Sequence, residues 1–358
     1  MAPQPNDAKA AAAKTDATAP AAGPIKNAFN QHTEHEIFEH PELHCVFPKA
    51  TSPPIPELPY DDRAKYADPT LKNLLANATV EHLAPKIGTQ LTGIQLHELT
   101  DAQKDELALL IAQRGVVFLV DQEITLEQQI ALGRYWGPLH VHQNLGHPEG
   151  KPEVVVVETS VEASAALMER QKLDPTNEWH SDVSCERQPP SYTSFKLLTK
   201  PPVGGDTLWA SGYEAYDRLS EPMKKFVEGL TAIHSSKEQA EEAAARGFTI
   251  RRPWVEFRHP VVRTHPVTKR KALYVNQAFT RRIVELSRAE SDAVLRMLYK
   301  HVNEGHEFQV RYRWSKNAVA IWDNRVTFHY ATFDFLPGNR QATRVTPHGE
   351  IPYLEKDE

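Results

Sequence analysis

The stretch Trp179-His180-Ser181-Asp182 places an imidazole and a carboxylate two residues apart. On a β-strand, or at its end, side chains at i and i+2 point to the same face, so both can reach one ion from a barrel wall. His329, far along the chain, would complete the set from another strand. Two histidines and one carboxylate bind Fe(II) and leave three coordination positions open for a co-substrate and dioxygen. His180, Asp182 and His329 are therefore the predicted metal ligands.

A His-X-Asp pair alone occurs by chance in many proteins, and its weight here comes from two arginines near the C-terminus. Arg340 follows His329 at a short distance, and Arg344 lies at i+4 from it. Such a pair on a strand shares a face, so both guanidinium groups are expected to enter the same barrel. Arginine suits bidentate recognition of carboxylates and related oxyanions. Two solvated arginines would be the commoner explanation for an isolated pair, but after a metal-type histidine the pair predicts two bound anions.

Composition bounds the partners and the compartment. The chain has 358 residues, a net charge of -6 and two cysteines, Cys45 and Cys185. The acidic balance argues against a nucleic-acid partner. The distant cysteines offer no disulfide framework and no zinc spacing, which favours a reducing compartment. No apolar run approaches the ~20 residues that span a bilayer, and the N-terminus lacks a signal-peptide core. A cytoplasmic protein without a membrane partner is expected.

Three parts follow from the distribution of prolines and apolar residues. Residues 1–25 are Ala/Pro/Lys low-complexity sequence and are expected to form a disordered tail. Residues 26–85 are punctuated by proline and are expected to form an arm packed on the body, with a short helix near 68–76. Residues 86–358 are expected to form the domain that carries the predicted metal ligands and both arginines.

Within that domain, short strand candidates alternate with helical segments. Thr100 and Thr125 are expected to cap two helices, the second over 126–136, and the apolar run 115–120 between them predicts a buried strand. Many short strands with long insertions predict a mainly β protein with helical insertions and a double-stranded β-helix (jelly roll) core. Further helices are expected over 212–231, 236–246 and 289–303, and strands over 153–158, 192–198, 207–210, 272–275, 308–314, 318–322 and 341–346.

Five stretches together carry a family resemblance. They are Trp179-His-Ser-Asp-Val183, Gly204-Gly-Asp-Thr-Leu-Trp209, His259-Pro-Val-Val-Arg-Thr-His-Pro266, Phe308-Gln-Val-Arg311 and Trp322-Asp-Asn-Arg-Val-Thr-Phe-His-Tyr330. Over roughly residues 85–355 the chain resembles the taurine dioxygenase family of Fe(II)/2-oxoglutarate-dependent dioxygenases. The resemblance implies a jelly roll, Fe(II) as the metal, 2-oxoglutarate as co-substrate and O2 as oxidant.

The same resemblance implies roles for individual residues. Thr207 and Arg340 would hold the distal carboxylate of 2-oxoglutarate, and Arg344 the anionic head of a small organosulfur substrate. His142 is similar to a residue that contacts the substrate sulfonate in the family. Phe279 is a candidate apolar wall of the substrate site, although ordinary core packing explains it equally well. The implied reaction hydroxylates the carbon that bears the sulfonate of an aliphatic, taurine-like sulfonate, and releases sulfite and an aldehyde with succinate and CO2 for sulfur assimilation.

Some alternatives stay open on the sequence. An alkylsulfatase-type dioxygenase, which releases sulfate from alkyl sulfate esters, shares the triad and both arginines. A zinc hydrolase built on His140, His142 and His147 is a rival of another class. Leu145 and Thr176 stand where taurine-specialised members carry Tyr and Asn, which points towards other or broader aliphatic sulfonates. The segment 235–252 is expected to form a helical lid, and the oligomeric state, a homo-oligomer included, is not determined.

Overall fold

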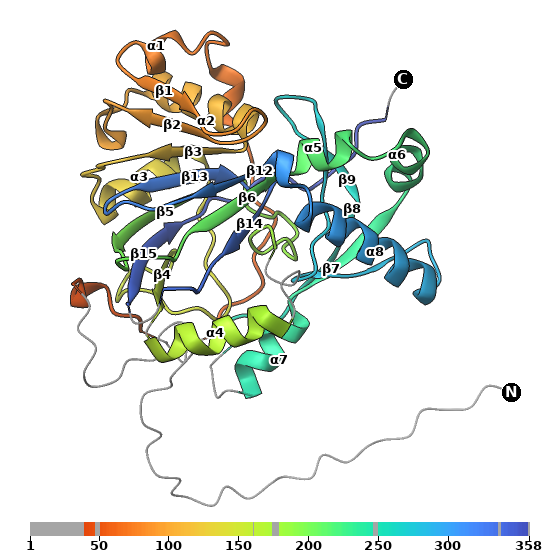
Figure 1. The fold of residues 1–358 in the computed structure, drawn as a ribbon. Coiled ribbons are helices and arrows are strands. Elements are labelled where there is room, and N and C mark those ends of the chain that lie inside the picture. The colour runs from red at the N-terminus through yellow and green to blue at the C-terminus, as the bar shows by residue number, and fades with distance from the viewer. Residues whose placement is uncertain are drawn as a thin grey trace, which may run out of the picture.

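The computed structural model describes residues 39–46, 51–159, 161–173, 179–245, 250–335 and 338–356. The expected tail over 1–25 and Thr176 lie outside these ranges. Two sheets packed face to face form a jelly-roll core, and helices cover the outer face of the larger sheet (Figure 1). Within the described part of the chain, no helix is both long and apolar enough to cross a membrane.

The larger sheet has seven strands, and all its pairings are antiparallel except the parallel pair of its second and third strands. The expected buried strand and the C-terminal strand that carries both arginines lie in it. In spatial order it consists of β1 (Thr79–His82), β2 (Thr89–Thr92), β3 (Val116–Leu119), β13 (Val319–Asp323), β5 (Tyr192–Thr199), β15 (Arg340–Val345) and β4 (Val154–Thr159).

The smaller core sheet has three strands, in the order β12 (Gln309–Tyr312), β6 (Thr207–Ser211) and β14 (Thr327–Ala331). Large aromatic rings fill the space between it and the larger sheet. Phe118 of β3 stacks on Tyr312 of β12 at 3.9 Å between ring centroids, and Trp209 of β6 meets Phe118 edge-on at 5.2 Å. Aromatic pairs of this kind combine a large buried area with a fixed geometry. They hold the two walls of the site at a defined separation.

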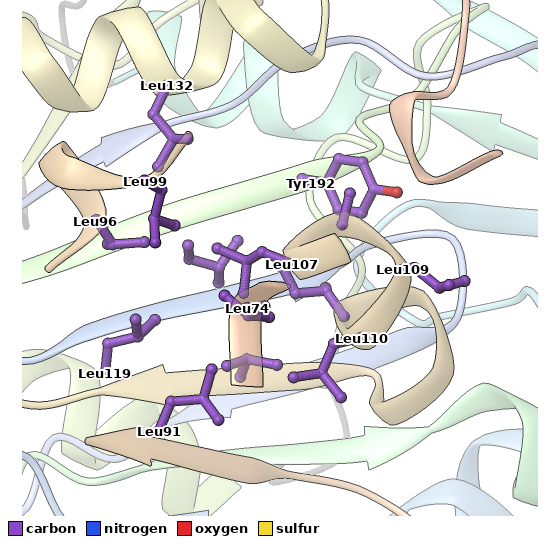
Figure 2. Packing of buried hydrophobic residues seen from close by; sticks show 14 of the residues in the cluster. Leu74, Leu91, Leu96, Leu99, Leu107, Leu109, Leu110, Leu119, Leu132 and Tyr192 are labelled. Atoms are coloured by element: carbon purple, nitrogen blue, oxygen red, sulfur yellow. The ribbon is translucent and has the colours of Figure 1, made fainter. Parts of the chain in front are cut away.

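A leucine-rich layer joins the outer face of the larger sheet to the helices α1 (Lys72–Leu75), α2 (Asp101–Arg114) and α3 (Leu126–Trp136). Leu107 and Leu110 of α2 pack in one cluster with Leu91 and Leu119 of the sheet (Figure 2). Thr100 and Thr125 form the expected caps. The side chain of each threonine accepts a hydrogen bond from the backbone N–H of the glutamine three residues later, and the side chain of that glutamine accepts one from the backbone N–H of the threonine. The two helices expected after Thr100 and Thr125 are confirmed.

Residues 212–303 form an insertion beside the core. The helix expected over 212–231 is interrupted after Asp217. A second helix begins at Glu221, with Ser220 as its N-cap and Pro222 in its first turn, where proline is accommodated. Thr231 already begins a strand. The insertion contains α5 (Gly212–Asp217), α6 (Glu221–Glu228), β7 (Thr231–Ser235), α7 (Lys237–Ala245), β8 (Glu256–Pro260), β9 (Val262–Thr264), β10 (Lys271–Leu273), β11 (Thr280–Ile283) and α8 (Arg288–Asn303). The remaining elements of the described residues are α4 (Val161–Leu173), which the sequence did not predict, and the short 3-10 helices Pro41–Leu43, Arg63–Tyr66, Leu96–Glu98 and His306–Phe308.

The segment expected as an arm is tied into the core. Its last residues form β1, the edge strand of the larger sheet, so regular structure begins before residue 86. All four β1 residues are exposed, which removes the alternation that would have revealed the strand. Further back, Asp62 Oδ2 lies 2.5 Å from Nη1 of Arg325, and Asp323 Oδ2 lies 2.7 Å from Nη2 of that fully buried guanidinium.

Replacing Asp62 with alanine is expected to destabilise the protein by about 3–5 kcal/mol, because it removes one partner of a buried ionic cluster. The measurement is the free energy of unfolding by chemical denaturation. Asp61→Ala is the matched control, since the neighbouring carboxylate is exposed and pairs with the surface residue Lys65. An equally small decrease in the free energy of unfolding for both variants would contradict the role of Asp62 in joining the arm to the core.

Candidate metal centre and substrate cavity

One strand, an isolated β-bridge and a turn bring the predicted metal ligands together, so His180 and Asp182 do not share the strand that the sequence analysis expected. His329 lies on β14, and the backbones of His180 and His329 exchange hydrogen bonds of 3.1 and 2.8 Å, so the two imidazoles face each other. The chain turns after His180 and returns the Asp182 carboxylate, whose Oδ1 lies 3.8 Å from His180 Nε2 and 3.9 Å from His329 Nε2. The ligand atoms of the three residues all lie within 4.8 Å of one another. This spacing suits one ion held from a single side.

Asp182 is oriented by polar residues that the sequence did not single out. Thr193 on β5 donates to Asp182 Oδ2 at 3.3 Å, and the backbone N–H of Asp182 donates to Asn324 Oδ1 at 3.2 Å. Asn324 in turn donates to Thr193 Oγ1 at 2.7 Å and accepts from the indole of Trp322 at 2.9 Å. Hydrogen bonds of this kind fix a ligating carboxylate. They hold Oδ2 and leave Oδ1 towards the two histidines.

The protonation states suit metal binding. Burial opposes ionisation of Asp182, but the charges of Arg344, His329 and His180 outweigh it and lower the pKa of the carboxyl. Burial, with the neighbouring His180, lowers the pKa of His329 to about 3. An ionised carboxylate and a neutral imidazole are the forms that coordinate a metal, so Asp182 and His329 need not lose protons at neutral pH.

Val183 gives the turn after Asp182 an unusual backbone. Its φ is 35°, in the left-handed region that β-branched residues rarely adopt. Its side chain is buried in a small cluster with Cys185 and Phe279. Strained residues persist where surrounding packing determines them, and they occur often at functional sites. The cluster thus holds the turn that presents Asp182, and it places Phe279 at the same site.

One cavity of about 530 Å³ contains every residue that the sequence analysis assigned to the site. The strands of both core sheets supply its floor, and α7 supplies part of its wall. This helix lies in the segment 235–252 that is expected to form a lid, of which residues 246–249 lie outside the described ranges. The cavity is lined by the triad together with Thr207, Arg340, Arg344, His142 and Phe279, and also by Phe333, Leu145 and four α7 residues, Glu238, Gln239, Glu242 and Ala243.

Arg340 is a buried cation in the cavity wall. It is 3 % exposed, and burial lowers the pKa of its guanidinium to about 10, which leaves it charged at neutral pH. The charge of Asp206 acts on Arg340 and raises its pKa slightly, but the Asp206 carboxylate forms its ion pair with Arg311. No carboxylate of the described residues pairs with Arg340. A buried charge without a partner is costly, so the wall is suited to an anionic ligand such as the distal carboxylate of 2-oxoglutarate.

Thr207 is prepared to donate a hydrogen bond beside Arg340. Its Oγ1 accepts from Arg340 Nη2 at 3.3 Å and from the indole N–H of Trp314 at 3.0 Å. Because a hydroxyl has two lone pairs and one hydrogen, these two bonds leave its O–H for a ligand. Trp314, which the sequence analysis missed, therefore sets the donor role of Thr207.

Arg344 differs from the simple expectation of a substrate-binding arginine. Its Nη1 donates to Asp182 Oδ1 at 2.7 Å, the same oxygen that lies between the histidines. The guanidinium thus lies beside the metal position. An anion that binds Arg344 must also lie next to the metal, whereas an anion on Arg340 lies against the opposite end of β15. The i, i+4 spacing on one strand therefore separates two anion positions in one cavity.

His142 presents a neutral imidazole donor to the cavity. Its Nδ1 accepts from the backbone N–H groups of Asn144 and Leu145 at 3.3 and 3.2 Å, which places the ring proton on Nε2. Burial, followed by the charge of Arg344, lowers the pKa of His142 well below its usual value. The loop therefore fixes both the tautomer and the charge of this side chain.

The rival zinc cluster is not assembled in the described residues. His140 binds Glu186 at 3.0 Å, and His147 Nδ1 donates to the carbonyl of Pro148 at 2.7 Å. Over the described ranges, the triad is the one group of three His, Cys, Asp or Glu residues with metal-binding geometry. The two outer histidines thus have structural partners, and His142 faces the cavity.

Comparisons with known proteins agree with this geometry. Residues 79–346 match the family model described as "Taurine catabolism dioxygenase TauD, TfdA family". An alpha-ketoglutarate-dependent sulfonate dioxygenase of Saccharomyces cerevisiae is 45% identical over 302 residues, which cover 82% of this chain and 73% of the relative. An alpha-ketoglutarate-dependent sulfate ester dioxygenase of Pseudomonas putida is 32% identical over 289 residues, covering 76% of this chain and 90% of the relative.

A solved structure shows the same fold. The crystal structure of a taurine dioxygenase from Burkholderia xenovorans superposes with a TM-score of 0.66 at 33% identity, and the match covers 78% of this chain and 93% of that one. Alpha-ketoglutarate is 2-oxoglutarate, an anion that the buried Arg340 is suited to bind, and the triad is suited to hold iron. The chain belongs to the TauD/TfdA family and is an Fe(II)- and 2-oxoglutarate-dependent dioxygenase.

Proposed function

We propose that the protein hydroxylates the carbon bearing the sulfonate of an aliphatic sulfonate, and so releases sulfite and an aldehyde for sulfur assimilation. The observation that carries the proposal is the second cationic position of the cavity. Arg344 and the neutral donor His142 lie beside the metal triad, apart from the buried Arg340. A sulfonate stays ionised at cellular pH, and a fixed guanidinium with one neutral N–H donor suits it.

Each site residue has a proposed task. His180, Asp182 and His329 hold the iron, and Arg340 with the Thr207 hydroxyl binds the distal carboxylate of 2-oxoglutarate. Iron, 2-oxoglutarate and O2 together supply the oxidation, with succinate and CO2 as by-products.

The remaining residues position the substrate. Arg344 and His142 bind the sulfonate oxygens, which brings the adjacent carbon next to the metal. Phe279 and Phe333 form apolar walls that exclude water from the reacting carbon. The hydroxylated carbon then loses sulfite because a carbon that carries both a hydroxyl and a sulfonate collapses to an aldehyde. The protein thus acts through position and charge.

The second candidate is oxidation of alkyl sulfate esters. The name of the P. putida relative supports it, while the higher identity to the S. cerevisiae relative favours a sulfonate. Both substrates end in an anionic sulfur group that Arg344 and His142 would bind. They differ in the released product, which is sulfite for one and sulfate for the other.

The test is to incubate the Fe(II)-loaded enzyme with 2-oxoglutarate, O2 and a panel of taurine, isethionate, longer alkylsulfonates and alkyl sulfates. Succinate, sulfite and sulfate are quantified together. Sulfite in proportion to succinate for any sulfonate supports the proposal and ranks the substrates. Succinate with sulfate supports the second candidate, and stimulation by neither class refutes both.

Arg344→Ala is expected to abolish the stimulation of 2-oxoglutarate turnover by a sulfonate while the slower, substrate-independent turnover persists. The reason is that Arg344 contacts the proposed substrate position, whereas Arg340 remains to bind 2-oxoglutarate. Succinate release is measured with and without the sulfonate. Arg313→Ala, at an exposed arginine that follows β12, is the control. Parallel loss of both rates in Arg344→Ala would show that its ion pair with Asp182 is needed for the metal site itself.

A further inference from the structure

A carboxylate lies behind the position at which Arg340 faces the cavity. Asp206 directly precedes Thr207, the first residue of β6, whose hydroxyl accepts a hydrogen bond from Arg340. Neighbouring residues on a strand point to opposite faces, and the burial follows this alternation, since Asp206 and Leu208 are half-buried whereas Thr207 is buried. Thr207 and Arg340 line the cavity and Asp206 does not, yet the charge of Asp206 acts on Arg340.

Arg311 of β12 binds this carboxylate from the outer face of the smaller core sheet. Its Nε donates to Asp206 Oδ2 at 2.7 Å, and its Nη2 lies 3.6 Å from Asp334 Oδ2. In the pairing of β12 with β6, Arg311 lies opposite Leu208 and therefore on the same face as Asp206. The side chain of Arg311 is 53 % exposed and that of Asp206 13 %. A solvent-facing cation thus covers a mostly buried anion.

The backbone around Asp206 has anchors other than this ion pair. Thr332 donates from its backbone N–H and from its hydroxyl to the carbonyl of Asp206, at 2.9 and 3.0 Å. Thr207 is paired in register with both neighbouring strands, β12 and β14. These contacts hold the start of β6 without the Arg311 guanidinium. Loss of that guanidinium is therefore expected to change the charge behind Arg340 more than the position of Thr207.

On the basis of the proposed function, in which Arg340 binds 2-oxoglutarate, we propose that Arg311 is a positioning residue for the co-substrate: it holds the Asp206 carboxylate in an ion pair on the outer face of the sheet and so preserves the positive potential of Arg340 in the cavity. Without Arg311, the negative charge of Asp206 is uncompensated. It then offsets the charge of Arg340 and repels the carboxylate of 2-oxoglutarate.

The two partners of the ion pair are expected to act in opposite directions. Arg311→Ala leaves an uncompensated anion behind Arg340 and should weaken the binding of 2-oxoglutarate. Asp206→Asn removes that anion and keeps the Arg311 cation, so the binding of 2-oxoglutarate should be unchanged or tighter. An ion pair with a purely structural role would weaken binding whichever partner is removed. The sign of the effect of Asp206→Asn therefore distinguishes the two roles.

Arg311→Ala is expected to weaken the binding of 2-oxoglutarate to the anaerobic Fe(II)-loaded enzyme by on the order of 3- to 10-fold, the scale for a charge that acts through partly solvated protein. The double variant Arg311→Ala/Asp206→Asn should recover the wild-type affinity. Dissociation constants are measured by titration calorimetry with 2-oxoglutarate. The KM values for 2-oxoglutarate and for a sulfonate are measured separately, and only the value for 2-oxoglutarate should change.

Two further measurements keep the test decisive. Arg313→Ala is the matched control, because it removes the same charge from an exposed arginine two residues after Arg311 and leaves the ion pair of Asp206 in place. It should bind 2-oxoglutarate like the wild type. A higher ionic strength should reduce the loss of affinity in Arg311→Ala, because salt screens charges near the surface. If Arg311→Ala does not fold, the sign of the effect of Asp206→Asn still tests the role.

The outcomes separate this inference from the assignment of Arg340. If Arg340→Ala binds 2-oxoglutarate as tightly as the wild type, that assignment fails and the inference fails with it. If Arg340→Ala loses affinity while Arg311→Ala keeps it, the inference alone is refuted. Weaker binding in Asp206→Asn, or no recovery in the double variant, would show that the ion pair only stabilises the fold. An equal loss in Arg313→Ala would replace the specific role by an effect of net charge.

Discussion

Asp182→Ala is expected to abolish Fe(II) binding and, with it, all 2-oxoglutarate turnover. Asp182 supplies the only carboxylate of the proposed triad, and its Oδ1 is the atom nearest both His180 and His329. Removal of an outer partner of a ligand costs roughly 10- to 100-fold in metal affinity, and loss of a ligand should exceed that range. The variant also leaves the Arg344 cation beside two imidazoles, which disfavours a second positive charge at the same place.

The measurement is anaerobic equilibrium dialysis with iron quantification, alongside succinate release. Asp292→Ala is the control, since that carboxylate pairs with Arg288 on the surface of α8 and should leave iron binding intact. Thr193→Val is a graded companion: it removes one hydrogen bond to Oδ2 and should weaken iron binding by no more than the outer-partner range. Iron retained by Asp182→Ala at wild-type affinity would place the metal elsewhere.

The core elements could be predicted because their signals are local. A window of about ten residues is enough to predict each of three elements: the capped helix after Thr100, the apolar strand 116–119 and the strand that carries Arg340 and Arg344. The insertion gave poorer predictions. Its strand β7 lies between the two segments expected as helices, 212–231 and 236–246, and only its first residue, Thr231, fell within one of them. Its strand β11 was not predicted, and it carries two arginines among its four residues. Such segments become strands because of the strands they pair with, and a single sequence does not show which strands these are.

The same distinction applies to the site. The two arginines were predictable because a fixed spacing on a strand decides which side chains share a face. The triad was predicted from its residue types and from the family resemblance, but the expected strand at His180 and Asp182 is an isolated bridge followed by a turn. Thr193, Asn324 and Trp314 could not be predicted, since each matters only through a neighbour far away in the sequence. The ion pair between Arg344 and Asp182 could not be predicted either, because it joins residues that are 162 positions apart in the sequence.

Arg340→Ala is expected to raise the KM for 2-oxoglutarate steeply while the KM for the sulfonate changes little. Truncation of one partner of a buried, hydrogen-bonded charge pair costs about 2–5 kcal/mol, and 2 kcal/mol already corresponds to roughly a 30-fold weaker affinity. The cost is at that scale because Arg340 is buried, charged at neutral pH and without a carboxylate partner among the described residues. The ligand carboxylate would therefore lose its whole counter-charge.

The steady-state KM for each substrate is measured at saturation of the other, with anaerobic 2-oxoglutarate binding as a readout independent of turnover. Thr207→Val should give a smaller loss in the same direction, about 0.5–1.5 kcal/mol, since it removes one neutral donor and keeps the cation. Arg340→Lys should fall between the two, because it keeps the charge but not the planar fork. This order, alanine then lysine then the threonine variant, follows from a carboxylate bound by Arg340 and Thr207 together. An unchanged 2-oxoglutarate affinity in Arg340→Ala would instead assign the buried guanidinium to the core and leave Arg344 as the remaining cation for the co-substrate.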